Sequence, residues 1–499
     1  MKNSQNRVIK MIEDNTCKFE GINSTRCGEE VYNDGHCIFH YKGKKDVNEF
    51  TRKFLEYLRK EEEIERHISE TENPQIWCNG FVFPHGFRLI RKKFSVELLF
   101  FEPKFQGLVS FIYATFEKPV RFFNPKFKGP AFFRNTCFES DAEFSHAEFY
   151  DNAFFQHATF NGKATFIDSM FKKSAIFDNA RFSGATSFEG AKFDGSTTFT
   201  DTTFSEDVEF TLARFLSTVS FKDTKFYKVA SFKASFFRNC YFEDTEFYGK
   251  VDFSHAHFEE DAVFEYIKNN EENQRYSIFA CEGDSKVDFR YSVFNQPEKV
   301  KFVKIDLSKA LFSHSNIENI RFVDVKWCFT GKVIKRKAIY DEIIGEDPYF
   351  VAEAYRRLRK NYESNLRYPE AGDFYIGEME MKRLSATFRG NEVKNKIVKF
   401  LFQNFSLTSF YKYFSLYGEN YWLSLIWILM TILIFSAVYH YCYGFEQLQA
   451  IEASIATFLQ YPPNQQNIKL PILLTLSERL AGITFIALFV LALRRRFKR

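Results

Sequence analysis

Four residues near the N-terminus, Cys17, Cys27, Cys37 and His40, carry side chains that bind tetrahedral metal ions. They lie in a short segment (CKFEGINSTRCGEEVYNDGHCIFH) that is rich in turn-forming residues and lacks the apolar residues for a core of its own. Thiolate and imidazole are preferred ligands of Zn²⁺, and four protein ligands make a closed, structural site. The spacing includes one C-x-x-H pair but matches no zinc-finger pattern. One structural zinc is therefore predicted, with ordinary reduced cysteines as the alternative.

Two adjacent charges, Glu478 and Arg479, interrupt an otherwise apolar stretch at residues 471–493. A charged side chain at the centre of a bilayer helix costs about 2.5–3.5 kcal/mol on insertion scales, and such residues are commonly functional. We predict that Glu478 lines a water-accessible vestibule formed between subunits and that Arg479 pairs with a neighbouring carboxylate or backbone carbonyl. The alternative is that both charges lie at the outer membrane interface. Thr457 and Gln460, in the short segment before this stretch, are further candidates for a pore lining.

A second acidic pair, Glu378 and Glu380, offers no comparable chemistry. The two residues are two positions apart, on different faces of a predicted helix, and no histidine is nearby. The sequence also contains no nucleophile–base arrangement, no phosphate-binding glycine loop and no catalytic metal spacing. The sequence therefore predicts that the protein is not an enzyme.

The element that must carry these groups is a long run of phenylalanines over residues 94–264. Phe recurs at alternating steps of five and six, so the unit has eleven residues, and a small residue such as Ala147 often stands two places before a Phe. These steps fit neither one stripe of an α-helix nor the alternation of a strand, but they fit a square coil with a turn after each side. The predicted core residues are Phe144, Phe149, Phe155, Phe160, Phe166, Phe171, Phe177, Phe182, Phe188, Phe193, Phe199, Phe204 and Phe210.

This stretch resembles the pentapeptide-repeat family, whose units centre on an inward Leu or Phe with a small residue two places earlier. The resemblance implies a mainly β fold: a right-handed quadrilateral β-helix, or solenoid, with roughly 22 residues per coil and coils ~4.8 Å apart. Polar residues and glycines should occupy the corners. Gly184→Ser should therefore matter far less than Phe188→Ala, unless that corner needs a positive φ. Four histidines are expected at solvated corners: His146, His157, His255 and His257. One residue is missing from the rhythm between Phe237 and Phe242.

Composition limits the remaining possibilities. A chain of 499 residues should fold as two to four domains, and a net charge of +4 is too small for a dedicated nucleic-acid binder. Nine scattered cysteines indicate a reducing compartment. No apolar segment with a cleavage site is found at the N-terminus, which is therefore expected to be cytosolic.

The C-terminal part is predicted to enter a membrane. Residues 421–445 contain no Asp, Glu, Lys or Arg and are long enough to span a bilayer, with aromatic anchors such as Trp422 and Tyr443 near the ends. Residues 471–493 form a second crossing, and the basic tail 494–499 places the C-terminus in the cytoplasm by the positive-inside rule. Residues 394–413, with alternating lysines and large apolar residues, are predicted to lie at the membrane surface.

The order of helix, short helix (449–461) and helix resembles the pore module of the potassium-channel superfamily. The resemblance is carried by YGENY before the first helix, by A-T-F in the short helix and by ERLAGITFIALFVLALRRRF at the end. It fails where ion selectivity is determined, because Thr457 is followed by FLQYPP, which contains no glycine. A potassium filter is therefore not expected.

Six segments are predicted: 1–45, a Cys/His-rich segment; 46–76, an amphipathic helical cap; 77–330, the β-helix; 331–393, a helical hairpin linker; 394–420, an interfacial segment; and 421–499, two transmembrane helices with a re-entrant segment. Two functions stay open. The first is a membrane-anchored scaffold whose cytoplasmic β-helix binds a protein partner. The second is a channel-like homo-oligomer, a tetramer by the resemblance, with the β-helix as a sensor or gate. The resemblance implies a multi-pass protein of a prokaryotic cell membrane with both termini cytoplasmic, and no nucleic acid is expected as a partner.

Overall fold

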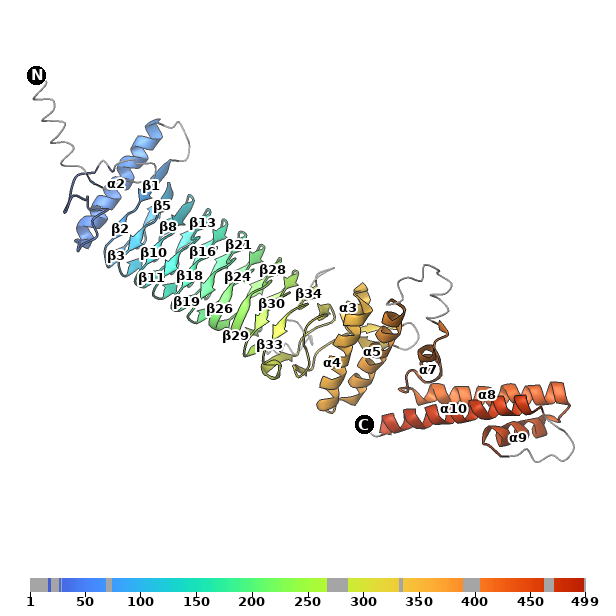
Figure 1. Ribbon diagram of the computed structural model, residues 1–499. Coiled ribbons are helices and arrows are strands. Elements are labelled where there is room, and N and C mark those ends of the chain that lie inside the picture. Colours follow the sequence, from blue (N-terminus) through green and yellow to red (C-terminus); the bar gives the residue numbers. More distant parts are fainter. Residues whose placement is uncertain are drawn as a thin grey trace, which may run out of the picture. The chain divides into compact units, whose positions relative to one another are not determined.

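Short parallel strands wound into a four-sided coil make up most of the structure, a computed structural model that describes residues 17–18, 27, 29–68, 74–266, 286–331, 335–388, 404–461 and 471–497. The chain divides into two units, Met1–Cys328 and Phe329–Arg499. The first holds the solenoid of about ten turns and its N-terminal helix, and the second holds the remaining helices (Figure 1).

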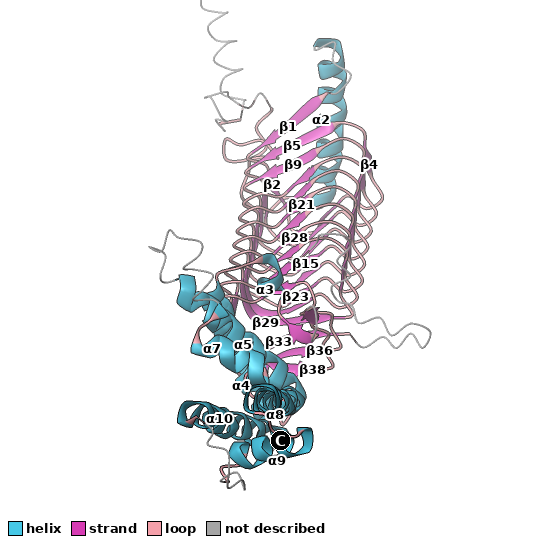
Figure 2. Ribbon diagram, turned by 90° about the vertical axis from the view of Figure 1, so that its right-hand side faces the viewer, coloured by secondary structure: helices cyan, strands magenta, loops and turns pink. Residues whose placement is uncertain are grey.

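The solenoid has four ladders of parallel strands, which Figure 2 shows stacked coil upon coil. Ladder 1 contains β1 (Gln75–Asn79), β5 (Glu97–Phe101), β9 (Val120–Phe123), β13 (Ala142–Glu143), β17 (Ala164–Thr165), β21 (Thr186–Ser187), β25 (Val208–Glu209), β28 (Ala230–Ser231), β31 (Val251–Asp252), β34 (Val287–Asp288) and β37 (Ala310–Leu311). Ladder 2 contains β2 (Val82–Phe83), β6 (Lys104–Phe105), β10 (Lys126–Phe127), β14 (Glu148–Phe149), β18 (Met170–Phe171), β22 (Lys192–Phe193), β32 (His257–Phe258) and β35 (Val293–Phe294).

The other two sides complete the square. Ladder 3 contains β3 (Phe87–Arg88), β7 (Val109–Ser110), β11 (Ala131–Phe132), β15 (Ala153–Phe154), β19 (Ala175–Ile176), β23 (Thr197–Thr198), β33 (Ala262–Glu265), β36 (Val300–Val303) and β38 (Arg321–Val323). Ladder 4 contains β4 (Lys93–Phe94), β8 (Thr115–Phe116), β12 (Cys137–Phe138), β16 (Thr159–Phe160), β20 (Arg181–Phe182), β24 (Thr203–Phe204), β27 (Lys225–Phe226) and β30 (Glu246–Phe247). Two long strands, β26 (Arg214–Ser220) and β29 (Phe236–Glu243), turn the corner between ladders 2 and 3. The predicted four-sided β-helix is confirmed.

The register is that of a 22-residue coil, since Phe127 pairs with Phe149 and Phe138 with Phe160. Side chains therefore stack on their own kind along the axis. Phe188, for example, lies 4.8 Å from Phe166 and 4.9 Å from Phe210, with interplanar angles of 7° and 2°. Each ring also meets rings of other ladders edge to face, as Phe188 meets Phe199 at 5.6 Å and 80°. Stacked and edge-to-face contacts are both favourable for aromatic quadrupoles. The thirteen predicted core phenylalanines are all buried.

Tight turns explain the alternation of five and six. The five-residue steps contain a residue with positive φ, as at His146 (56°) and His157 (57°), and the turn closes with the Ala147 amide donating to Phe144 O (3.1 Å). A positive φ at the third residue is the type II turn pattern, and Asn, Asp and His tolerate it better than most residues. His255 occupies the same kind of corner, but His257 lies in β32 rather than at a corner.

The missing residue is absorbed locally. Phe215 pairs with Phe237 at a separation of 22, whereas Thr218 pairs with Asn239 at 21, so the register shifts between Phe215 and Thr218. The separation between paired residues is again 22 where Phe242 pairs with Phe264. The polar segment predicted to leave the rod at 265–286 lies mostly outside the described residues.

The N-terminal helix covers the first coil. Helix α2 (Val47–Ile68) places its apolar stripe inward, and Phe50 and Phe54 are fully buried. Phe54 meets Phe83 at 5.6 Å and Phe87 at 5.7 Å, both edge to face. The cap protects the apolar end of the solenoid from water, which a stack of identical coils cannot do for itself.

The first unit also contains the short helix η2 (Pro297–Lys299), between β35 and β36. The second unit is helical apart from the paired strands β39 (Cys328–Thr330) and β40 (Arg336–Ala338). Its helices are α3 (Tyr340–Ile344), α4 (Pro348–Ser364), α5 (Tyr368–Phe388), α7 (Leu407–Ser415), α8 (Tyr421–Tyr443), α9 (Gln447–Phe458) and α10 (Ile472–Phe497). Helices α4 and α5 pack as a hairpin, and α9 packs on both α8 and α10. Lys394, Lys396 and Lys399 of the predicted interfacial segment lie outside the described residues.

The expectation for Gly184→Ser considered the backbone angle of this corner but not its packing. A Cβ atom at Gly184 would lie 2.4 Å from the carbonyl oxygen of Gly162, the equivalent residue one coil earlier. The obstacle is backbone, so it cannot move aside as a flexible side chain could. Gly184 is therefore required by the close approach of coils rather than by its backbone angles.

We predict that Phe188→Ala lowers the free energy of unfolding by about 3–5 kcal/mol, because stacked coils cannot collapse onto the cavity. Gly184→Ser should also destabilise, by about 1–3 kcal/mol, through overpacking. Denaturant unfolding monitored by circular dichroism measures both. Ser183→Ala, at the adjacent corner position, is the control and should change little. An unchanged unfolding midpoint for Phe188→Ala would contradict the inward register.

Candidate metal centre and a buried membrane-helix carboxylate

The four predicted metal ligands converge in the structure. The ligand atoms of Cys17, Cys27, Cys37 and His40 all lie within 4.8 Å of one another. The two thiol sulfurs of Cys27 and Cys37 are 3.8 Å apart, and the Nδ1 atom of His40 is 3.4 Å from Cys17 Sγ and 3.1 Å from Cys37 Sγ. Tetrahedral zinc with Zn–S near 2.3 Å and Zn–N near 2.0 Å separates its ligands by about 3.5–3.8 Å. The cluster could therefore hold one metal ion.

Local backbone structure brings the ligands together. The amide of Cys17 donates to Glu29 O (3.0 Å), which joins the first ligand to the segment that carries the others. A turn closed by the amides of His40 and Tyr41 on Cys37 O places Cys37 and His40 on one side. The irregular sequence spacing of the ligands is thus compensated by long-range backbone contacts.

A neighbouring carbonyl fixes the histidine. His40 Nε2 donates to Asn79 O in β1 at 2.8 Å, which leaves Nδ1 as the ligand atom. Such an outer contact sets the tautomer and the ring orientation of metal-binding histidines. The neighbouring Phe39 stacks on Phe81 at 4.7 Å and 5°. The cluster is therefore tied to the first coil of the solenoid, a link that sequence spacing did not reveal.

Without a metal, the cluster favours thiols. The hydrogen bond with Cys27, followed by burial, raises the pKa of Cys37 to about 12. Metal ligands must be thiolates, so loading must release protons and should become tighter as pH rises.

The other predicted pair, Glu478 and Arg479, is separated by the fold. Glu478 is fully buried within a single chain and accepts hydrogen bonds from Tyr439 of α8 and Ser454 of α9. The burial of Glu478 within one chain gives no support to the predicted vestibule between subunits, which stays a prediction. Hydroxyls from two neighbouring helices satisfy the carboxyl group, and it joins α8, α9 and α10 at one point.

The remaining pore candidates, Thr457, Gln460 and Arg479, differ in their surroundings within the chain. Thr457 is buried and donates to Ala453 O (2.8 Å) in its own helix. Gln460 has a φ of 72° and donates through Nε2 to Arg479 O (3.0 Å). Arg479 Nε is buried without a hydrogen-bond partner among the described residues. The predicted pairing of Arg479 with a carboxylate or carbonyl is not seen at this atom.

The acidic pair in the hairpin forms structural ion pairs. Glu378 is buried and accepts from Arg359 Nε (2.8 Å) in α4. Glu380 accepts from Arg383 (2.6 Å), from Lys412 in α7 (2.9 Å) and from the Tyr417 hydroxyl (2.7 Å). Burial alone would raise the pKa of Glu380, but these hydrogen bonds lower it to about 2. Its stabilisation is full above the ordinary value of 4.5 and is lost as pH falls through about 2.

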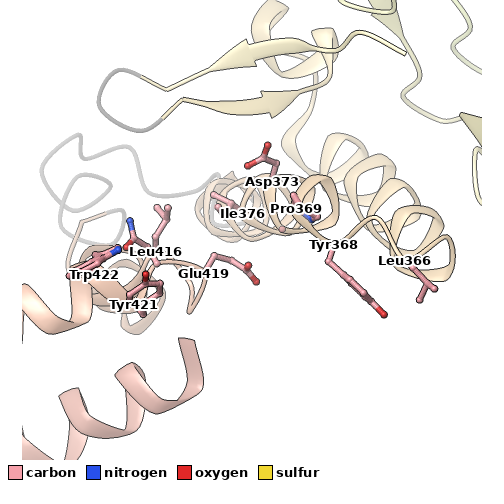
Figure 3. Close-up of a pocket in the computed structure, with 11 residues that line it drawn as sticks. Leu366, Tyr368, Pro369, Asp373, Ile376, Leu416, Glu419, Tyr421 and Trp422 are labelled. Carbon is pink, nitrogen blue, oxygen red and sulfur yellow. The ribbon is translucent and has the colours of Figure 1, made fainter. Parts of the chain in front are cut away.

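A cavity of about 680 Å³ adjoins the hairpin in the second unit. Figure 3 shows its lining side chains, which come from the start of α5 and from the turn that leads into α8. Asp373 accepts from the Lys337 amide (3.1 Å), and Glu419 pairs with Arg495 (3.4 Å). Since both carboxylates already have partners, the cavity has no clear ligand signature.

Comparison with known proteins identifies the repeats. Three overlapping segments, 144–192, 177–225 and 221–267, match the family model described as pentapeptide repeats (9 copies). The solenoid is thus built on pentapeptide repeats, as predicted. No curated protein and no solved structure matches the chain.

We predict that the purified protein carries about one zinc ion per chain and that Cys37→Ser lowers this content, because a closed site needs all four ligands. Atomic emission on protein purified without chelators measures it. Cys137→Ser, in β12 and outside the cluster, is the matched control and should keep the metal. Metal-free protein that folds normally would leave only reduced cysteines.

We predict that Glu478→Leu loosens α9, because the hydroxyls of Tyr439 and Ser454 each lose a buried partner at a cost of about 1–3 kcal/mol. Glu478→Gln should be milder, because an amide oxygen can still accept a hydrogen bond. Hydrogen exchange of the α9 amides in detergent is the readout. Equal exchange in wild-type and Glu478→Leu protein would show that the carboxyl does not hold α9.

Proposed function

We propose that the protein is a membrane-anchored scaffold: α8 and α10 hold it in the bilayer, and the solenoid presents a rigid surface to a protein partner. The observation that carries the anchor is the exposure of the two helices. Their most apolar windows have mean hydropathies of 2.1 and 1.8, yet only 17% and 22% of these windows are buried within the chain. A core helix of a soluble protein would be mostly buried, so these surfaces favour lipid contact.

The character of the exposed side chains supports this anchor. Leu433 of α8 and Ile483 of α10 are more than half exposed, and α8 contains no Asp, Glu, Lys or Arg. Ser424, Thr431 and Ser436 of α8 are turned inward instead. Apolar residues outside and hydroxyls inside are the arrangement expected of helices solvated by hydrocarbon.

Charge at the helix ends supports a cytoplasmic location for both termini. Arg495, at the end of α10, donates to Tyr417 O (2.8 Å) just before the start of α8, so these two ends lie together. Arg494 and Lys412 add positive charge to the same end of the pair. By the positive-inside rule this end is cytoplasmic, and the solenoid lies on the same side. A prokaryotic cell membrane stays the predicted location.

The scaffold role rests on the shape of the solenoid. Its interior is filled with stacked phenylalanine rings, which leaves only the outer faces for partners. The Cys/His cluster serves, in this proposal, as a structural zinc site that closes the N-terminal end. Catalysis and nucleic-acid binding are not part of the proposed function.

A channel-like assembly is the second candidate, and one observation favours it. Helix α9 is too short to span a bilayer and packs against both α8 and α10, as a re-entrant helix does. Its outer face is apolar and exposed at Leu448 (72%), where another chain or lipid would have to cover it. The filter-like segment is missing, so any conducted ion would differ from potassium in its coordination.

Alkaline carbonate extraction of membranes tests the anchor. The full chain should stay in the pellet, and a chain ending before α8 should be released, because no spanning helix would remain. Release of the full chain into the supernatant would contradict the anchor. The mass of the detergent-purified protein, corrected for detergent, then separates the candidates: four chains favour the channel, and fewer favour the scaffold.

A further inference from the structure

The outer face of ladder 3 is unusual because its charges are separated along the solenoid. Its outward residues are partly exposed, since each strand of the ladder turns one side chain inward and the next outward. The first coils carry Arg88, Arg91 and Arg134. The later coils carry Asp178, Asp201 and Asp223. Lys222 lies among the later carboxylates, and Lys172 and Lys173 lie at the corner before β19. One side of the rod therefore has a basic half and an acidic half.

An apolar strip lies between the two halves. The outward residues Phe132, Phe154 and Ile176 pair with one another along the ladder. The rings of Phe132 and Phe154 stack at 4.8 Å and 7°, and the Arg134 guanidinium lies 4.6 Å from the centroid of Phe154. Aromatic residues and arginine are enriched in protein interfaces relative to the rest of the surface.

We propose that this face binds the same face of a second copy of the chain, with the two solenoids antiparallel. The two-fold axis would lie along β15, through the coil of Phe154. Rotation about this axis keeps the strand direction and exchanges coils on either side of it. A coil that lies a given number of coils before Phe154 would therefore face the coil that lies the same number after Phe154 in the partner. The two copies would use the same surface, so the interface is isologous.

The charges at the corner between ladders 3 and 4 match under this operation. The corner residues with positive φ recur every coil, and Arg91 lies three coils before His157 while Asp223 lies three coils after it. Arg91 would therefore face Asp223 of the second copy, at the same corner of the coil. Arg134 directly follows the inward ring of Phe133, and Asp178 directly follows that of Phe177. These two rings stack on Phe155 from the preceding and the following coil, so Arg134 and Asp178 are equivalent positions on either side of the axis.

The apolar residues match as well. Phe132 would face Ile176, and Phe154 would face its own copy on the axis. A two-fold axis parallel to the solenoid would instead place each coil opposite its own copy. The basic coils would then face each other, and so would the acidic coils, which is unfavourable for like charges. The pattern thus favours one orientation and one register, which gives a scaffold with two solenoids side by side. This inference deepens the scaffold role proposed above and rests on it.

The mass of the full-length protein in detergent tests this interface by charge exchange. Wild-type protein should be dimeric in ~50 mM salt and should dissociate toward monomer in ~500 mM salt, because exposed charge pairs are screened. Arg134→Glu and Asp178→Arg should each give monomers. The double variant should restore the dimer, because the exchanged charges again face each other. Arg181→Glu, an exposed change on ladder 4, is the control and should remain dimeric.

Three results would overturn the proposal: monomeric wild-type protein in low salt, a dimer unaffected by Arg134→Glu, or a double variant that stays monomeric. Unchanged circular dichroism and melting temperature of each variant exclude unfolding as the cause of monomers. As a second test, Gln156→Cys lies beside the axis and should cross-link to its own copy, whereas Ser183→Cys on ladder 4 should not. Carbonate extraction of Arg134→Glu separates the two proposals, because loss of the dimer should leave the membrane anchor intact.

Discussion

Stacking of phenylalanine on phenylalanine at every coil is the interaction on which the structure depends. A backbone repeat of 22 residues returns the chain to the same side after four turns, and the hydrogen bonds of the parallel ladders then fix the distance between coils. Rings of this size fill the square interior only when each lies directly on its predecessor. The same spacing accounts for the alanines beside the rings, for the polar residues at positive-φ corners and for the need of glycine at Gly184, where one backbone meets the next.

Most of the solenoid could be predicted because its information is local and repeated. The five–six rhythm specified the coil, its core and even the one-residue deletion that the structure absorbs between Phe215 and Thr218. Gly184 could not be judged in the same way, since its constraint is a carbonyl oxygen that lies 22 residues away and touches it only after coils stack. The periodicity shows which residues are equivalent in successive coils, but it does not show how closely their backbones approach.

The candidate sites were harder to predict because their partners are distant in sequence. Residue types alone suggested that Cys17, Cys27, Cys37 and His40 belong together, but the anchoring of His40 on Asn79 O depends on the first coil. The hydrogen-bond partners of Glu478 were missed for the same reason. Its hydroxyl partners, Tyr439 and Ser454, are 39 and 24 residues away, and in the sequence they look like minor interruptions of apolar helices. The sequence did contain one signal for this contact: hydroxyl residues in two apolar helices, together with a single carboxylate in a third.

Under the proposed function, the chain is divided between two solvents: the aromatic-cored solenoid lies in water, and the faces of α8 and α10 lie in lipid. Spin-label accessibility in proteoliposomes tests this division most directly. A label introduced by Ile483→Cys, on the exposed face of α10, should collide readily with oxygen and rarely with a water-soluble nickel chelate. A label introduced by Tyr227→Cys, on the solenoid surface, should show the reverse. Ready access of the nickel chelate to the label at position 483 would contradict the account.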